Sequence, residues 1–287
     1  MMSRNLLLRI AFAVPAIGVT IAAVWWGGWA LAVLLAFLGV LGAREVYELG
    51  RRQGVPALDG LGYVAAAAIP FGAIWAQQTG VLWAEPLLFL GALWLLVVMV
   101  GAMFLRSPEE RPLTAIAVTV FGALYASALL AFVVPIRHGS HSDAHPLAST
   151  ALVMLPLAVT WICDTAAMAV GTWIGGPRLA PVLSPRKTWS GGVAGGVAAL
   201  VAAFAYGRFV LDRVALHLDV VQLMAVGAAI AVMGQVGDVA ESLLKREAGV
   251  KDSSGLIPGH GGVLDRLDSL YFVVPVSATL LRLFGVI

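Results

Sequence analysis

Residues 242–268 place eight charged side chains and one histidine in a chain that is otherwise strongly apolar. The segment reads SLLKREAGVKDSSGLIPGHGGVLDRLD. A lipid-embedded chain seldom keeps so many ionisable groups together unless they act on a polar partner. Cations, carboxylates and a flexible glycine-rich turn are what phosphate and metal-ion chemistry require. The segment is therefore the first candidate for an active site.

The residues that lead into this segment predict one polar stripe on a helix. Asp238, Glu241, Ser242 and Lys245 recur at i, i+3, i+4 and i+7, and apolar side chains cover the rest of the helix. A carboxylate as deep in an apolar helix as Asp238 is costly unless it is paired or binds a cation. Two interpretations stay open: a metal ligand, or an internal Asp238–Lys245 pair that only locks helices together.

The turn that follows predicts close approach of backbone to a ligand. Gly261 and Gly262 can adopt positive φ, and consecutive amides in such a turn can form an anion-binding nest. Asp265 and Asp268 are three residues apart, so we expect them on one face at the start of the last helix. A carboxylate there also suits a helix N-terminus, which is the alternative role of Asp268. Asp238 and Asp265 are predicted to converge as hard oxygen ligands for Mg²⁺.

A second candidate segment, SPRKTWSGG, covers residues 184–192. Ser184 and the proline after it predict a turn or a helix start. Arg186, Lys187 and Thr188 then present two cations and a hydroxyl. A basic pair such as Arg186 and Lys187 at a membrane edge is also a common topology anchor. The segment lacks the GxxxxGK[ST] pattern of a P-loop. Four-residue glycine spacing after it predicts close helix packing, at Gly191 with Gly195 and Gly192 with Gly196.

Asp164 is a third candidate, because it lies within a long apolar run. It could serve a metal site, pair with a lysine or arginine, or accept a structural hydrogen bond. The histidine-rich segment 137–145, RHGSHSDAH, has spacing that resembles metal ligands. We interpret it as a solvated loop.

Composition predicts an all-α polytopic membrane protein. The 287 residues are 60% hydrophobic and 12% charged, whereas about a quarter of a soluble domain is charged. A net charge of +2 gives no indication of nucleic-acid binding. Apolar runs near the length of about 20 residues that crosses a bilayer predict about nine transmembrane helices. They lie at about 8–26, 28–43, 61–77, 82–104, 113–135, 150–175, 190–209, 220–244 and 267–286.

The distribution of basic residues predicts the orientation of these spans. With nine spans and a cytoplasmic N-terminus, 14 of the 18 Lys and Arg residues fall in inner segments and 4 in outer ones. About five spans then occupy residues 1–149, and about four occupy a catalytic region at 150–287 within one integral membrane domain. Loops 176–189 and 245–266 share the cytoplasmic face. We therefore expect the active site at the cytoplasmic membrane edge.

Residues 242–268 resemble the signature of the phosphatidate cytidylyltransferases, or CDP-diacylglycerol synthases. The resemblance rests on Ser242, Lys245-Arg246, Lys251-Asp252, Pro258, His260-Gly261-Gly262, Asp265-Arg266 and Asp268. It extends to Cys163-Asp164, to residues 184–188 and to Gly237-Asp238. Residues 1–150 resemble the family only as generic membrane spans.

The resemblance implies transfer of the cytidylyl group of CTP to phosphatidate, giving CDP-diacylglycerol and pyrophosphate in a bacterial inner membrane. It implies catalytic roles for Lys187, Lys245, Arg246, Asp238 and Asp265. Substrate contacts are implied for Ser184, Thr188, Ser242, Lys251, His260, Gly261, Gly262 and Arg266. One or two Mg²⁺ ions are expected on Asp238 and Asp265, with Asp164, Glu241 and Asp268 as further candidates. A monovalent ion could also take part, and a homo-oligomer stays open.

Two other functions stay open. A CTP-dependent lipid-alcohol kinase would move the γ-phosphoryl group and leave CDP. A cation-coupled transporter would use Asp164, Asp238 and Glu241 to line an ion path, which leaves the glycine-rich loop unexplained.

Overall fold

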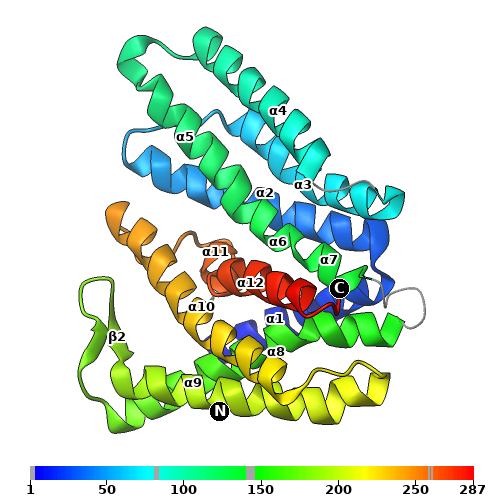
Figure 1. Ribbon diagram of the computed structural model, residues 1–287. Coiled ribbons are helices and arrows are strands. Elements are labelled where there is room, and N and C mark those ends of the chain that lie inside the picture. The colour runs from blue at the N-terminus through cyan, green and yellow to red at the C-terminus, as the bar shows by residue number, and fades with distance from the viewer. Residues whose placement is uncertain (1–3, 81–83, 140–145, 258, 260) are drawn as a thin grey trace. The chain divides into compact units, whose positions relative to one another are not determined.

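The computed structural model describes residues 4–80, 84–139, 146–257, 259 and 261–287. These residues are mainly helical, with one two-stranded sheet (Figure 1). The long helices are α1 (Arg4–Trp26), α2 (Gly28–Arg52), α3 (Asp59–Thr79), α4 (Ala84–Leu105), α5 (Pro112–Ala123), α8 (Pro146–Ile174), α9 (Trp189–Tyr206), α10 (Val220–Glu247) and α12 (Leu270–Leu283). The short ones are η1 (Pro108–Glu110), η2 (Leu124–Ala128), α6 (Leu129–Ala131), α7 (Val133–Arg137), η3 (Gly207–Leu211), η4 (Asp212–Val214) and α11 (Leu264–Leu267). The strands are β1 (Arg178–Ala180) and β2 (Ser184–Thr188).

The apolar helices confirm the predicted all-α polytopic membrane class. Within the described ranges, seven helical runs are long and apolar enough to cross a bilayer. They are Gly28–Arg52, Asp59–Thr79, Leu88–Leu105, Pro112–Arg137, Pro146–Ile174, Trp189–Val214 and Val220–Glu247. Two of the nine predicted spans are not among these runs. The apolar run Ala13–Trp26 is shorter than a span, and α12 has 14 residues, about 21 Å against a hydrocarbon core of roughly 30 Å.

The chain divides into two compact units. The first combines Met1–Val134 with Leu244–Arg266, and the second combines Pro135–Leu243 with Leu267–Ile287. These boundaries follow spatial contacts, so the signature segment groups with the N-terminal helices. The predicted division at residues 149 and 150, which followed the order of the motifs, stays a prediction.

The first unit is built around helices α2, α3 and α5, with α4 against α3 and α5 (Figure 1). Tyr47 of α2 is fully buried at their centre, and its hydroxyl donates to the Thr119 carbonyl at 2.8 Å. Gly62 of α3 and Gly122 of α5 lie against its ring, so a Cβ at either position would overlap Tyr47. Small residues let the three helices approach closely around one large side chain.

The second unit is built around α8 and α9, which pack along each other. A Cβ on Gly191 would lie 2.5 Å from the Ala167 carbonyl oxygen, and one on Gly195 would lie 3.0 Å from that of Cys163. These contacts confirm the close packing predicted at Gly191 and Gly195. The prediction is wrong for Gly196, where a Cβ would meet no atom within 4 Å.

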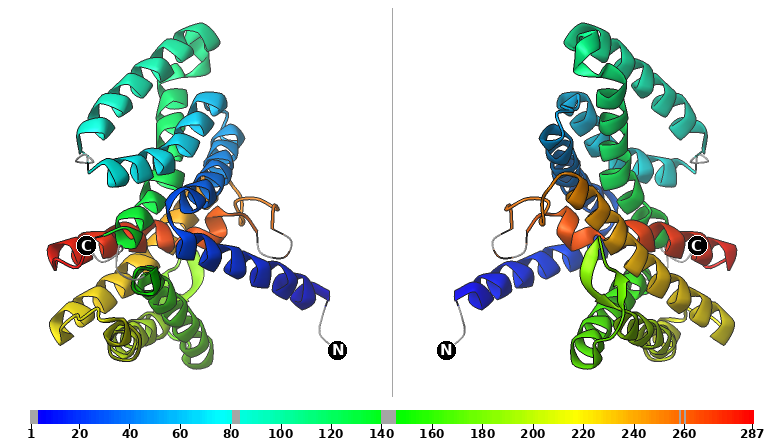
Figure 2. Two further views of the ribbon diagram at one scale, coloured as in Figure 1. Left: turned by 90° about the vertical axis from the view of Figure 1, so that its right-hand side faces the viewer. Right: turned by 90° about the vertical axis from the view of Figure 1, so that its left-hand side faces the viewer.

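A short hairpin connects α8 to α9. Its strands β1 and β2 pair antiparallel and form the yellow-green hairpin in Figure 2. Arg178 lies opposite Thr188, and Ala180 lies opposite Ser184. The predicted turn or helix start at Ser184 is therefore wrong. A proline is tolerated next to it because both strands of a two-stranded sheet are edge strands. Thr188 then caps α9, since its hydroxyl accepts a hydrogen bond from the Gly191 amide at 3.2 Å.

Alanine at position 62 is expected to destabilise the protein by about 1–3 kcal/mol, because the added methyl group would overpack the Tyr47 hydroxyl. Gly60→Ala on the same helix is the control, since a Cβ there meets no atom within 4 Å. Thermal unfolding in detergent, followed by tryptophan fluorescence, measures both variants. Equal midpoints for Gly62→Ala and Gly60→Ala would contradict this account of the core.

Candidate active site

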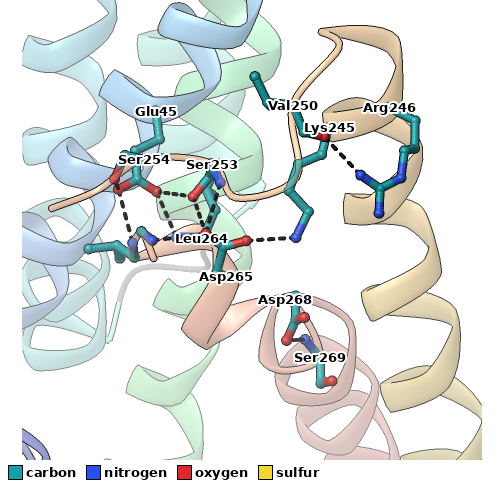
Figure 3. Close-up of polar contacts among 12 residues, drawn as sticks. Glu45, Lys245, Arg246, Val250, Ser253, Ser254, Leu264, Asp265, Asp268 and Ser269 are labelled. Atoms are coloured by element: carbon teal, nitrogen blue, oxygen red, sulfur yellow. Dashed lines mark hydrogen bonds and ion pairs between the residues drawn. The ribbon is translucent and has the colours of Figure 1, made fainter. Parts of the chain in front are cut away.

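The signature loop, residues 248–263, joins α10 to α11 and is organised around Asp265 (Figure 3). The ammonium of Lys245 lies 2.6 Å from Asp265 Oδ1, and the two side chains are only 10% and 5% exposed. Asp265 Oδ2 accepts hydrogen bonds from the Ser253 amide at 2.8 Å, the Ser253 hydroxyl at 2.9 Å and the Gly262 amide at 2.8 Å. Both carboxylate oxygens are therefore engaged by the protein itself.

These contacts decide the ionisation of Asp265. Burial alone would raise its pKa, because a low-dielectric environment disfavours the charged form. The Lys245 hydrogen bond, with the amides of Gly262 and Ser253, outweighs burial and holds the pKa below its usual value. Asp265 is therefore a carboxylate at neutral pH, and it is matched by one cation.

A second buried carboxylate, Glu45 of α2, holds the same loop. Its side chain accepts a hydrogen bond from the Ser254 hydroxyl at 2.6 Å. It also lies 2.9 Å from the Ser253 hydroxyl, whose single proton it shares with Asp265. It also accepts from the amides of Val263 and Leu264, each at 2.9 Å. The sequence-based interpretation missed Glu45, because the predicted second span ended at residue 43. An acidic residue so close to the end of an apolar run was the available signal.

The two adjacent glycines at the end of the loop, Gly261 and Gly262, make room for these carboxylates. Gly261 has φ 82°, and a Cβ there would lie 2.6 Å from Asp265 Oδ2. A Cβ on Gly262 would overlap the Ser253 hydroxyl and the Glu45 carboxylate. The sequence predicted backbone approach to a ligand at this turn. The groups that approach it in this structure are the protein's own acidic side chains.

The second unit holds another charged cluster, contributed by three elements. Lys187 of β2 lies 2.7 Å from Asp238 of α10, with side chains 22% and 35% exposed. The Lys187 ammonium also approaches the Gln235 carbonyl at 3.4 Å. Asp164 of α8 is exposed and is close enough to Lys187 and Asp238 to interact electrostatically. Two carboxylates therefore lie near one lysine, and none of the three side chains is fully buried within the protein.

Comparison with known proteins places the chain in a family. The model of the cytidylyltransferase family matches residues 7–284. The chain belongs to the cytidylyltransferase family. The match confirms the resemblance found in the C-terminal half. It also corrects the interpretation of the N-terminal half as generic spans, because it includes most of those residues.

Named relatives in the cytidylyltransferase family are phosphatidate cytidylyltransferases. The Brucella suis protein is 43% identical over 142 residues, which are 50% of this chain and 49% of that protein. The Haemophilus influenzae protein is 39% identical over 140 residues, 49% of this chain and 48% of that protein. The chain thus covers about half the length of these two relatives. The Thermotoga maritima protein is 32% identical over 206 residues, 71% of this chain and 73% of that protein.

Two predicted groupings of charged residues differ in the structure of this cytidylyltransferase-family chain. Asp265 and Asp268 do not share the start of the last helix, which begins at Leu270. Asp268 lies in the turn after α11, where its carboxylate accepts from the Ser269 amide at 2.7 Å. The turn forms because the Ser269 hydroxyl donates to the Gly234 carbonyl of α10 at 3.1 Å. The alternative Asp238–Lys245 pair is also replaced, since the two residues pair with Lys187 and Asp265.

The other predicted site residues of this family member have varied positions. Ser242 and Glu241 are buried on α10, and the Thr188 hydroxyl caps α9. Ser184 is half-buried on β2. Lys251 and Arg266 are exposed, and so is Arg246, which donates to the Val250 carbonyl at 3.0 Å.

His260 lies outside the described residues, as does most of the histidine-rich segment 137–145. Among the residues that are described, no three His, Cys, Asp or Glu side chains form a metal-binding group.

The lowered pKa of Asp265 predicts how the signature loop responds to acid. A carboxylate whose folded pKa is lowered contributes stability that is complete above its unfolded pKa of about 3.9. That contribution is lost as the pH falls through the folded pKa. Backbone protection of the loop should therefore stay constant from about pH 8 to about pH 5, and fall only in stronger acid. Hydrogen exchange, corrected for the intrinsic effect of pH, measures it; loss of protection between about pH 7 and about pH 5 would contradict this.

Proposed function

We propose that this chain transfers the cytidylyl group of CTP to phosphatidate, forming CDP-diacylglycerol and releasing pyrophosphate. The observation that carries the proposal is the family match over residues 7–284, with the signature loop ordered around Lys245 and Asp265. The names of the relatives favour this reaction over a lipid-alcohol kinase or a transporter. Lipid-spanning helices beside a charged site suit a substrate with an anionic headgroup and acyl chains.

The proposed chemistry needs positioning and charge neutralisation more than a general base. The phosphatidate phosphate is anionic near neutral pH, so its oxygen can attack the α-phosphorus of CTP directly. A new oxygen–phosphorus bond forms as the bond to the β-phosphate breaks, and pyrophosphate leaves. Lys187, Lys245 and Arg246 would offset the phosphate charge. Substrate contacts are proposed for Ser184, Thr188, Ser242, Lys251, His260 and Arg266. Contacts of Gly261 and Gly262 stay predictions from the resemblance, because the Gly262 amide is already donated to Asp265.

The residues of the second unit fit a divalent cation. Among the described residues, Lys187 is the cation that pairs with Asp238, and it lies near Asp164 as well. Carboxylate oxygens are the donors that Mg²⁺ prefers. We place Mg²⁺ on Asp238, with Asp164 beside it. When bound there, it would supply neutralisation of the CTP phosphates. Asp265 stays a proposed ligand, but a cation could reach it only by displacing Lys245 or a loop donor.

The proposed location is a bacterial inner membrane, with about nine spans and the N-terminus in the cytoplasm. The excess of basic residues in the inner segments supports this orientation. It would put loops 176–189 and 245–266 at the cytoplasmic membrane edge, where CTP is supplied.

CTP labelled at the α-phosphorus tests the reaction. The protein is purified in detergent–lipid micelles and supplied with phosphatidate and Mg²⁺. We expect label to enter the lipid phase, because the α-phosphorus becomes part of the product. Omission of phosphatidate is the control and should abolish the transfer. Label that stays wholly in the aqueous phase would overturn the proposed function.

Asp238→Asn is expected to reduce turnover by at least about 100-fold and to raise the Mg²⁺ concentration required for half-maximal activity. The carboxylate charge is lost while the side-chain shape is kept. Asp212→Asn is the control, because Asp212 also pairs with a cation in the same unit, in its case Arg208 at 3.3 Å. Steady-state rates across a Mg²⁺ series measure both variants. Near-normal turnover of Asp238→Asn with unchanged Mg²⁺ dependence would refute the metal assignment, and Asp265→Asn applies the same test to Asp265.

A further inference from the structure

We propose that Glu45 is a positioning residue that fixes the signature loop from the N-terminal part of the chain. The inference rests on the proposed function, since it assigns Glu45 a role in cytidylyl transfer. It goes beyond that function because Glu45 lies outside every motif that led to it. The α2 residue is separated from Ser253 by 208 positions in the sequence.

The Glu45 carboxylate fastens two segments to each other: residues 253–254 within the loop, and residues 263–264 where the loop meets α11. Its Oε1 accepts from the Ser254 hydroxyl at 2.6 Å and from the Val263 amide at 2.9 Å. Its Oε2 lies 2.9 Å from the Ser253 hydroxyl and accepts from the Leu264 amide at 2.9 Å. Each oxygen therefore joins one donor of the first segment to one donor of the second. Release of Glu45 would separate the two segments.

Burial makes these contacts specific for a carboxylate. Glu45 is only 4% exposed, and burial of an ionised group is costly unless hydrogen bonds compensate it. Three donors to Glu45, with a fourth at Ser253 that is shared with Asp265, supply that compensation. Glutamine at this position would turn an NH₂ group toward two of those donors, and aspartate would be shorter by one methylene. Neither replacement can accept all four hydrogen bonds.

The contacts of Glu45 continue directly to Asp265. The Ser253 hydroxyl lies 2.9 Å from an oxygen of each carboxylate, and the Ser253 amide donates to Asp265 at 2.8 Å. The amides of Gly262, Val263 and Leu264 divide between Asp265, which takes the first, and Glu45, which takes the other two. Glu45 thereby fixes the backbone that places Asp265, and Asp265 pairs with Lys245 at 2.6 Å.

The absence of a side chain at position 262 supports the same conclusion. A Cβ on Gly262 would overlap the Glu45 carboxylate and the Ser253 hydroxyl, so only glycine fits while Glu45 is in place. The amides of Gly262, Val263 and Leu264 are already donated to carboxylates. A nucleotide phosphate would have to find its donors elsewhere, at side chains such as Lys251 and Arg266.

Glu45→Gln tests the inference, with Glu48→Gln as the matched control. Glu48 lies one turn further along α2, where it is 44% exposed and pairs with Arg51 at 3.0 Å. Two quantities are measured for each variant: hydrogen exchange of peptides from residues 248–266, and cytidylyl transfer from CTP. Peptides from α3 and α5 report whether any change extends beyond the loop.

We expect Glu45→Gln to lower protection of the loop peptides by about 10-fold or more, with α3 and α5 unchanged. Transfer activity should fall by a similar or larger factor, whereas Glu48→Gln should match the wild type. Ser254→Ala removes one donor to the same carboxylate and should produce a smaller loss of both. Added to Glu45→Gln, it should cost less than it costs alone, because the Glu45–Ser254 hydrogen bond is already altered and the contact with the Leu256 amide is what remains to be lost.

Three results would overturn the inference. The first is loop exchange in Glu45→Gln equal to that in Glu48→Gln. The second is a loosened loop with normal transfer activity. The third is additive effects of Glu45→Gln and Ser254→Ala. If Glu45→Gln does not fold, Ser254→Ala decides alone: unchanged loop exchange would overturn the inference. Hydrogen exchange needs no turnover, so a wild type without transfer activity would reject the proposed function separately.

Discussion

A carboxylate taken out of water must be matched by cations or hydrogen-bond donors, and this constraint organises the signature loop. Glu45 and Asp265 are both buried, and together they accept hydrogen bonds from one lysine, two serine hydroxyls and four backbone amides. A loop of this length with two glycines at its turn has little regular structure of its own. Its conformation follows from the need to surround two negative charges.

The charged cluster of the second unit has the opposite character. Lys187, Asp238 and Asp164 come from β2, α10 and α8, and all three are at least partly exposed. Their charges are unequal, with two carboxylates to one ammonium. A saturated, buried carboxylate is suited to hold a structure, whereas an exposed one with spare oxygens is suited to meet a cation or a substrate. Because of this contrast, we assign Asp265 and Glu45 the role of holding the loop in position. We propose Asp238 as the first ligand of a metal ion.

Sequence reasoning found the charged residues that cluster in the structure better than it found their partners. Periodicity over 234–246 correctly predicted one helix, and charge in an apolar chain identified Lys245, Asp265, Lys187 and Asp238. Spacing could not show that Asp265 and Asp268 are separated by the end of α11, because Ser269 binds a carbonyl on another helix. Partner choice depends on contacts between distant residues, so the Lys187–Asp238 pair was not specified by either motif.

Glu45 shows the same limit more clearly. Hydropathy ended the second span at residue 43, because charged residues follow it, whereas α2 continues to Arg52. The donors that make burial of Glu45 tolerable lie more than 200 positions away, so no local pattern could reveal them.

The hairpin of β1 and β2 was missed for a different reason. A serine–proline pair is a common turn signal, and only the strand opposite shows that it is extended here.

The leaving group of the reaction tests the central claim most directly. Phosphorus-31 NMR of purified protein with CTP, phosphatidate and Mg²⁺ identifies every phosphorus-containing product in one spectrum. Attack at the α-phosphorus predicts pyrophosphate and a CDP-linked lipid in equal amounts, with neither formed when phosphatidate is left out. CDP without pyrophosphate would place the attack at the γ-phosphorus and contradict the account, and unchanged CTP would contradict it equally.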